Sequence, residues 1–250
     1  MIFEEEKKPV RGLGDGISNK ERIILILFRV LLFGVMMGAQ AYLASRGKLS
    51  ADNINDASML KLTLMYSAAG VFITFFILYK YLRDSFDRIF DDIRGILKVV
   101  LMAFLIQFLL NMAVMLAAGA LKLDLASPPN NQAVIGLADT SYRTVFVLTV
   151  VLAPILEETL YRAAIYGGLL RFGRAPAYIL SILLFAGLHV FTFVLGSGDL
   201  SMLRYLIVYI PASFALTWCY EKSGNIWAPI IMHTLSNLLA MYTLKATGMM

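Results

Sequence analysis

Long apolar stretches separated by short polar segments dominate the chain. Seven stretches have close to, or more than, the roughly 20 apolar residues that a helix needs to cross the hydrocarbon core of a bilayer. They lie at residues 23–44, 60–80, 97–121, 143–169, 177–196, 202–220 and 226–244. An eighth helix or a re-entrant piece within 121–142 stays open. The pattern therefore predicts an all-α, polytopic membrane helical bundle of about seven to eight transmembrane helices.

The composition agrees with a membrane protein and excludes other classes. Of the 250 residues, 59% are hydrophobic and 16% are charged, whereas soluble chains average about 45–50% and 25%. So few charges exclude a soluble enzyme, a disordered tail and a nucleic-acid-binding domain. The net charge of +5 is expected to come from cytoplasmic loops that face anionic lipid. The single cysteine, Cys219, lies in an apolar run and is expected to be a buried, inert thiol.

The positions of Lys and Arg predict the orientation. With the N-terminus inside, thirteen of them fall in inside segments and seven in outside segments, which favours a cytoplasmic N-terminus. We expect no signal peptide in the charged first 22 residues, and we expect a multi-pass protein of a bacterial cell membrane. We divide the chain into a cytoplasmic segment (1–22), N-terminal transmembrane helices (23–139) and a C-terminal helical core (140–246).

Three residues of the first apolar stretch bear on packing. Arg29 is expected to extend its guanidinium towards the cytoplasmic end of the helix. Gly34 and Gly38 form a pattern of small residues four apart. This pattern is found both at homodimer faces and where helices pack closely within one bundle, and both interpretations stay open.

Ionisable residues inside the apolar stretches are informative because each costs roughly 2.5–3.5 kcal/mol at the middle of a membrane helix. The fourth stretch contains Glu157, Glu158 and Arg162. Glu158 and Arg162 are four residues apart and should pair along one helix face, which leaves Glu157 without an obvious partner. Pro154 should kink the helix just before the acidic pair and so admit water or a partner side chain there.

Both histidines of the chain also lie in apolar stretches. Asn237 follows His233 by four residues and shares its helix face. At 1.5 Å per residue, Glu157, His189 and His233 lie roughly 10–20 Å from the inside ends of their helices, so they can meet at one depth. A carboxylate beside two imidazoles is typical of sites that activate water, directly or through a metal. Scattered polar residues that pack within the bundle are the alternative interpretation.

Three motifs in this region resemble those of the CPBP intramembrane proteases, also called the Abi or CAAX-prenyl-protease-2-like family. The matches are Glu157, Glu158 and Arg162 for Glu-Glu-x-x-x-Arg, Phe185 and His189 for Phe-x-x-x-His, and His233 and Asn237 for His-x-x-x-Asn. The resemblance covers roughly residues 140–245. Ala163 departs from the glycine that many relatives have after the arginine, which should not affect the chemistry.

The resemblance implies a helical bundle that cleaves peptide bonds in or at the membrane, with 140–246 as its catalytic core. The implied roles are general base for Glu157, water positioning for His189, oxyanion stabilisation for His233 and Asn237, and support for Glu158, Arg162 and Phe185. The implied cofactor is either none or Zn²⁺. Glu157, His189 and His233 make a two-His-one-carboxylate zinc set, in which case Glu158 would become the leading base. The chain has no His-Glu-x-x-His sequence, and metal-free catalysis is slightly favoured.

An intramembrane endopeptidase is the leading hypothesis, because every motif position is filled. The alternatives are a non-catalytic membrane scaffold or bacteriocin-immunity protein of the same family, and a transporter with a proton relay. The transporter is disfavoured because no repeated halves are found. The expected partners are a membrane-associated peptide or protein substrate, the lipid bilayer and, for a homodimer, a second copy of the chain. No nucleic acid is expected, and the substrate is left open.

Overall fold

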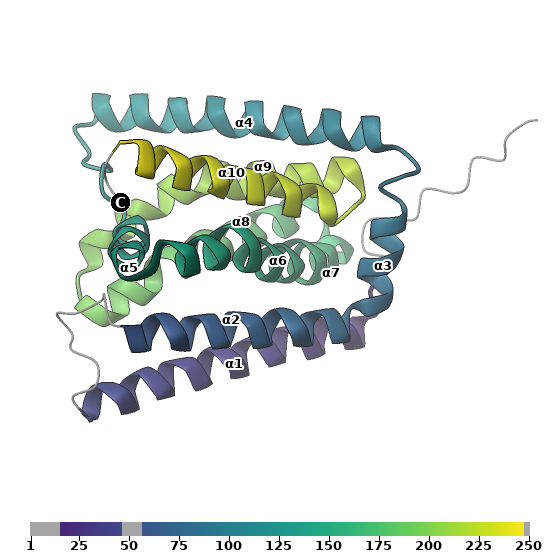
Figure 1. Cartoon of the computed structure of the whole chain (residues 1–250). Helices are drawn as coiled ribbons and strands as arrows, with labels where there is room; N and C mark the ends of the chain where they lie inside the picture. The colour runs from purple at the N-terminus through teal and green to yellow at the C-terminus, as the bar shows by residue number, and fades with distance from the viewer. Residues whose placement is uncertain (1–15, 47–56, 248–250) are drawn as a thin grey trace, which may run out of the picture.

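The chain is described by a computed structural model that covers residues 16–46 and 57–247. Its elements are helical, with no β-strand in these two ranges (Figure 1). They are α1 (Asn19–Ser45), α2 (Ala57–Ile77), α3 (Tyr79–Asp87), α4 (Ile93–Ala120), α5 (Pro129–Phe146), η1 (Val147–Leu152), α6 (Ala153–Glu158), η2 (Thr159–Tyr166), α7 (Gly167–Leu169), η3 (Leu170–Phe172), α8 (Arg174–Ser197), η4 (Leu200–Tyr205), α9 (Leu206–Ser223) and α10 (Trp227–Ala246). Residues 1–15 of the predicted cytoplasmic segment lie outside the described residues.

The apolar runs form helices because a backbone in lipid must satisfy its hydrogen bonds within its own segment. Short polar connections begin and end them. Asp92 accepts a hydrogen bond from the Gly95 amide at 2.9 Å and caps the start of α4. Gly198 and Gly224 follow α8 and α9 with φ angles of 71° and 60°, a left-handed conformation that glycine adopts at little steric cost.

The long helices run roughly side by side, and the α5–α7 segment lies among the others. In Figure 1, α4, α9 and α10 lie on one side of this segment, and α1 and α2 lie on the other. α9 packs against α4 and α8, α10 contacts α4, α9, η1 and α6, and α1 contacts α2 and η2. The segment that contains the acidic pair is therefore surrounded by both the N-terminal and the C-terminal helices.

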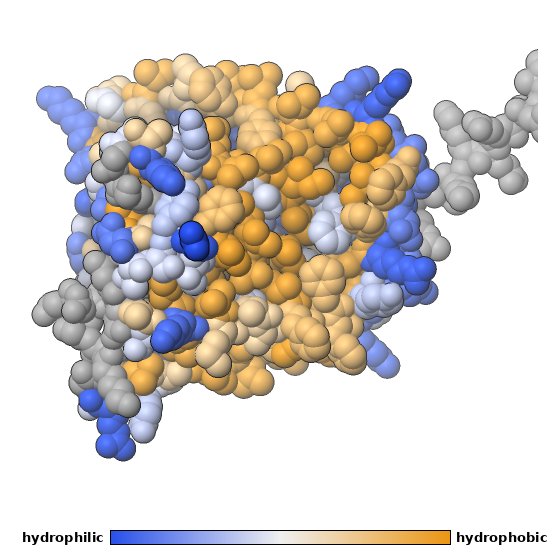
Figure 2. All heavy atoms as spheres, viewed as in Figure 1, coloured by the Kyte–Doolittle hydropathy of each residue, from blue (hydrophilic) through white to orange (hydrophobic). Residues whose placement is uncertain are grey.

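In the described part of the chain, six helical segments are long and apolar enough to cross a membrane. They are Asn19–Leu43, Ala57–Ile77, Ile93–Ala120, Pro129–Phe172, Arg174–Ser197 and Leu200–Ser223. Figure 2 shows a broad apolar band across the molecule and charged side chains gathered at its two ends. Side chains such as Phe76 and Leu195, which are 81% and 85% exposed, face the surroundings as they would face lipid tails. The protein is a multi-pass membrane protein built as an all-α bundle.

The structure also bears on the number of helices. The seventh predicted stretch forms α10, which is not among the six because His233 and Asn237 lower its hydropathy. The region 121–142 holds the start of α5, which begins at Pro129 and continues into the fourth span. Ser141 interrupts this helix with φ −160° and ψ 95°. The cytoplasmic location of the N-terminus and the division at residues 139 and 140 stay predictions.

The first helix differs from two of the expectations. Arg29 does not extend to the end of α1: it is only 8% exposed, and a Cβ on Gly70 of α2 would lie 2.9 Å from its Nη1 atom. The guanidinium takes the space that the missing Gly70 side chain leaves. Gly34 and Gly38 face open space, so they are not sites of close internal packing, and the homodimer stays a prediction. Cys219 is buried, as expected.

Candidate active site

The acidic pair ends a short α-helix that lies between two π-helical segments. Glu157 and Glu158 are the last residues of α6, which η1 precedes and η2 follows. Pro154 stands in the first turn of α6, where the missing backbone N–H of proline is best tolerated. The kink expected at this proline stays a prediction. The turns before and after α6 are π-helical, a form that is frequent at functional sites.

Glu158 and Arg162 form the ion pair that their spacing predicts. Arg162 Nη1 donates to Glu158 Oε1 at 3.1 Å, and both side chains are fully buried. Arg162 Nη2 donates to the carbonyl oxygen and to the hydroxyl of Ser213 in α9, both at 3.1 Å. His233 Nδ1 of α10 lies 2.8 Å from the same Glu158 oxygen. This network connects η2, α9 and α10, and its partners offset the cost of burying the charges.

Glu157 faces the other histidine. His189 Nδ1 lies 2.9 Å from the carbonyl oxygen of Phe185. Because that oxygen can only accept, Nδ1 carries a hydrogen, and Nε2 of the neutral ring has a lone pair. Nε2 lies 3.9 Å from Glu157 Oε2, and both side chains are 16% exposed. That Glu157 oxygen has no hydrogen-bond partner among the described residues. Two acceptor atoms thus face each other at a separation that one water molecule can bridge.

Phe185 lies at the centre of the aromatic contacts of the site. Its ring centroid is 4.6 Å from that of His189 and 6.0 Å from that of His233. The Arg162 guanidinium carbon lies 4.6 Å from the same ring. On α9, Tyr209 also stacks on His189, with a centroid distance of 4.6 Å and an interplanar angle of 27°. The two aromatic rings restrict the orientation of the His189 imidazole.

Asn237 attaches α10 to the segment before the acidic pair. Its Nδ2 donates to the carbonyl oxygen of Thr149 in η1 at 2.7 Å. His233 and Asn237 share one face of α10, so this face contacts η1 through Asn237 and α6 through His233. One N–H of the Asn237 amide remains for a further acceptor.

All seven residues predicted for the site lie in the described part of the chain and come from four elements that meet, α6, η2, α8 and α10. Their grouping differs from the zinc set Glu157, His189 and His233, because His233 binds Glu158 rather than Glu157. In residues 16–46 and 57–247, no three His, Cys, Asp or Glu side chains are arranged to hold a metal ion. The three predicted ligands therefore do not fit a zinc site in this arrangement.

Three residues of the site were not predicted from the sequence. They are Thr149, Tyr209 and Ser213. The sequence gives only weak signals for them: each is one polar or aromatic residue in an apolar helix, at no fixed spacing from a motif. Their roles depend on which helices pack together.

Comparison with known protein families finds a match in this region. Residues 140–239 match the family described as type II CAAX prenyl endopeptidase Rce1-like. These residues contain all three motifs. The resemblance seen in the motifs is therefore confirmed for this part of the chain.

Three curated relatives are similar to parts of the chain. An uncharacterized protein of Mycoplasma capricolum is 27% identical over 228 residues, which is 86% of this chain and 64% of the relative. The UPF0177 protein YxdF of Lactococcus lactis is 30% identical over 95 residues, 38% of this chain and 47% of the relative. The protein named "Putative membrane peptidase YdiL" of Bacillus subtilis is 29% identical over 108 residues, 43% of this chain and 40% of the relative. The chain thus spans less than two thirds of each relative's length. No solved structure matches the chain significantly.

Proposed function

We propose that this protein is an intramembrane endopeptidase, because residues 140–239 match the Rce1-like family of type II CAAX prenyl endopeptidases. Its substrates are peptides or proteins associated with the membrane. The reaction is hydrolysis of a peptide bond by a water molecule that Glu157 activates. The single observation that carries the proposal is the approach of Glu157 Oε2 to His189 Nε2 at 3.9 Å.

Both atoms are acceptors, so a water molecule between them donates one hydrogen to each. Its oxygen lone pair is then directed away from the pair, towards a substrate carbonyl carbon. Glu157 takes a proton as the water oxygen attacks, and general base catalysis of this kind contributes about 10²–10⁴-fold to the rate. His189 orients the water, since its Nδ1–H is bound to the Phe185 carbonyl and its ring is stacked on Tyr209.

The attack places a negative charge on the former carbonyl oxygen. In this proposal His233 and Asn237 stabilise that oxyanion by hydrogen bonding. His233 donates Nε2–H when its ring carries both hydrogens, with Nδ1–H bound to Glu158, and Asn237 donates the amide hydrogen that Thr149 does not accept. Glu157 then returns its proton to the leaving amine nitrogen as the C–N bond breaks. No step of this scheme requires a metal ion.

The experiment that tests the function compares the N-termini of membrane proteins in cells that express the wild type or Glu157→Ala. New termini that depend on Glu157 are expected, and they identify the substrate at the same time. A matched control is Asp139→Asn, which changes an exposed carboxylate of α5 and should leave the termini unchanged. Identical profiles for wild type and Glu157→Ala, at equal expression, would favour the non-catalytic scaffold instead.

A further inference from the structure

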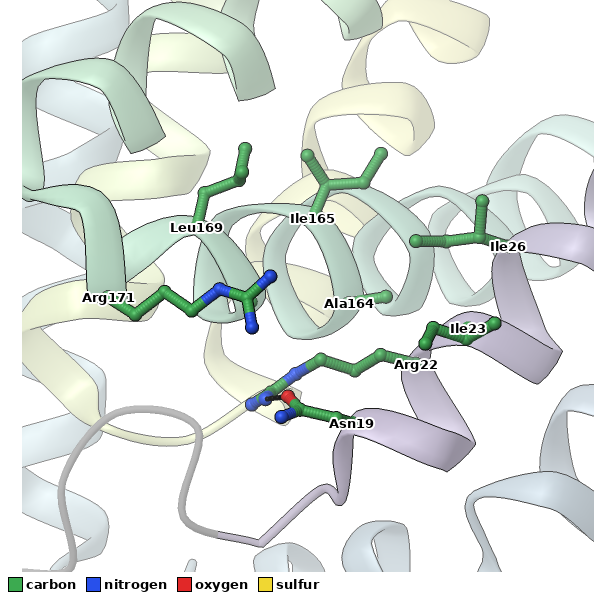
Figure 3. A pocket seen from close by; sticks show the side chains of 9 residues that line it. Asn19, Arg22, Ile23, Ile26, Ala164, Ile165, Leu169 and Arg171 are labelled. Atoms are coloured by element: carbon green, nitrogen blue, oxygen red, sulfur yellow. Dashed lines mark hydrogen bonds between the residues drawn. The ribbon is translucent and has the colours of Figure 1, made fainter.

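A second feature lies apart from the acidic pair, where the start of α1 meets the η2–η3 segment. A pocket of about 230 Å³ opens between these elements. Its residues include neither the acidic pair nor either histidine, so it is separate from the candidate active site. Figure 3 shows the side chains that line it.

The charged part of the pocket is cationic. Arg22 of α1 and Arg171 of η3 both line it, together with Asn19, and within residues 16–46 and 57–247 no acidic residue does. Figure 3 shows the two arginine side chains extending towards each other from opposite sides, with Asn19 beside Arg22. Arg22 is also held towards the bundle, since its Nε lies 3.5 Å from the Ala163 carbonyl oxygen. Two guanidinium groups that converge in this way suit a phosphate group.

The rest of the pocket is apolar. Ile23 and Ile26 line it from α1, and Ile165 and Leu169 line it from the opposite segment. Ala164 and Gly168 also line the pocket and contribute little or no side chain to it, and the Arg22 side chain lies against Gly168, where a Cβ would be 3.2 Å from its Cδ. The surface that continues from the arginines into the bundle is therefore suited to a hydrocarbon chain.

The pocket is also at a suitable depth in the membrane. Asn19 begins the first candidate span and Phe172 ends the fourth, so Arg22 and Arg171 lie at the level of the lipid headgroups. Ile26 lies one helical turn further along α1, about 6 Å deeper. A cationic group at the headgroup level above an apolar wall is the arrangement in which pockets between helices bind anionic lipid.

We propose that this pocket is a binding site for an anionic phospholipid. The phosphate lies between Arg22 and Arg171, and the first part of one acyl chain lies against Ile23, Ile26, Ile165 and Leu169. The headgroup carries a net negative charge, because two cations line the site. The bound lipid contacts α1 and the segment that follows the acidic pair, and so holds an N-terminal helix against the catalytic region.

The test uses the full-length protein in nanodiscs of phosphatidylcholine to which phosphatidylglycerol is added. Thermal unfolding midpoints measured against the phosphatidylglycerol content give the affinity, because a ligand that binds only the folded state stabilises it. The wild type should be stabilised in a saturable way. Arg171→Gln should weaken binding about fivefold, and the Arg22→Gln/Arg171→Gln pair about 25-fold. Arg83→Gln/Arg94→Gln, which changes two exposed basic residues near the same end of the bundle, should bind as the wild type does.

A second pair of variants leaves the charges in place. Ile23→Trp should fill the pocket and abolish the saturable stabilisation, whereas Leu27→Trp, at a more exposed position of the same helix, should not. This comparison stays informative if the double arginine variant does not fold. If both double arginine variants bound phosphatidylglycerol more weakly by the same factor, the attraction would be diffuse and not due to a site. That result would overturn the proposal. Equal stabilisation by inorganic phosphate alone would make the ligand a free anion and also overturn it.

Discussion

At the scale of single residues, Phe185 links the two histidines of the site. Its ring contacts His189, lies 6.0 Å from His233, and lies under the Arg162 guanidinium at 4.6 Å. Its carbonyl oxygen accepts from His189 Nδ1 and so sets the tautomer of that ring. Phe185 thus fixes the orientation of the His189 imidazole. Its ring also packs against the Arg162 guanidinium, which binds Glu158.

Replacing Phe185 by leucine should separate these effects. Leu keeps an apolar side chain but cannot stack on imidazole or guanidinium, so we expect a stability loss of about 0.5–1.5 kcal/mol and a lower kcat with little change in KM. Kinetics with the identified substrate and thermal unfolding in detergent measure both. Phe104→Leu, at a partly buried position that packs against the same core cluster, is the control. An unchanged kcat in Phe185→Leu would show that the ring is only structural.

Replacing the two residues that face the water should stop the reaction without unfolding the protein. Glu157→Gln and His189→Gln each put an amide where an acceptor stood, and each should lower kcat/KM by about 10²–10⁴-fold. If both act on one water molecule, the double variant should be about as slow as the slower single variant. Additive losses, or a mild effect of Glu157→Gln, would contradict the assignment of the base.

At the scale of elements, the Glu158–Arg162 pair is the connection between η2, α9 and α10. Removing one partner leaves a buried charge unpaired, so Arg162→Met or Glu158→Gln should each cost about 3–5 kcal/mol. Because the double variant leaves neither charge, it should be more stable than the sum of the two losses indicates. The free energies of unfolding of the wild type, the two single variants and the double variant, measured in detergent, test this expectation. The control is Arg174→Gln. The Arg174 side chain is 62% exposed and pairs with Glu221, so this change should cost far less stability. An equal loss of stability at the Glu158–Arg162 pair and at the Arg174–Glu221 pair would contradict the proposed connection.

Much of this arrangement could be predicted from sequence because it depends on local spacing. The helices follow from apolar length, and the Glu158–Arg162 pair follows from a separation of four residues. Contacts between helices could not be predicted in this way. Ser213 and Tyr209 reach the site because α9 packs beside α8 and η2, which no spacing within α9 indicates. Whether His233 binds Glu157 or Glu158 depends on the rotation of α6.

Arg29 shows the same limit in another form. An arginine near the end of an apolar helix usually extends to the interface, and the sequence of α1 contains nothing against that expectation. The buried position arises because Gly70, on the neighbouring helix, leaves room for the guanidinium. The deciding residue is 41 positions away in the sequence.

At the scale of the whole molecule, the chain alternates between the two charged ends of an apolar band. Phe90→Cys and Asn130→Cys place thiols between α3 and α4 and at the start of α5, on opposite sides of the α4 span. With the N-terminus inside, an impermeant maleimide should label intact cells at residue 130 and should label residue 90 only after permeabilisation. Cys219 is fully buried and should contribute little background. The reverse pattern would contradict the predicted orientation. Labelling of both thiols from one side would show that α4 does not cross the membrane between them.

The two π-helical segments let the helix hold an extra residue without turning the acidic pair away from its partners. A π-helical turn holds about one residue more than an α-helical turn, so deleting a single codon within 147–152 is expected to convert η1 into ordinary α-helix. The rotation of about 100° that is lost with the deleted residue is regained, because each remaining residue turns further in an α-helix than in a π-helix. Glu157 and Glu158 would therefore keep facing their histidines. A related gene that is one residue shorter in this segment can thus still encode an intact site.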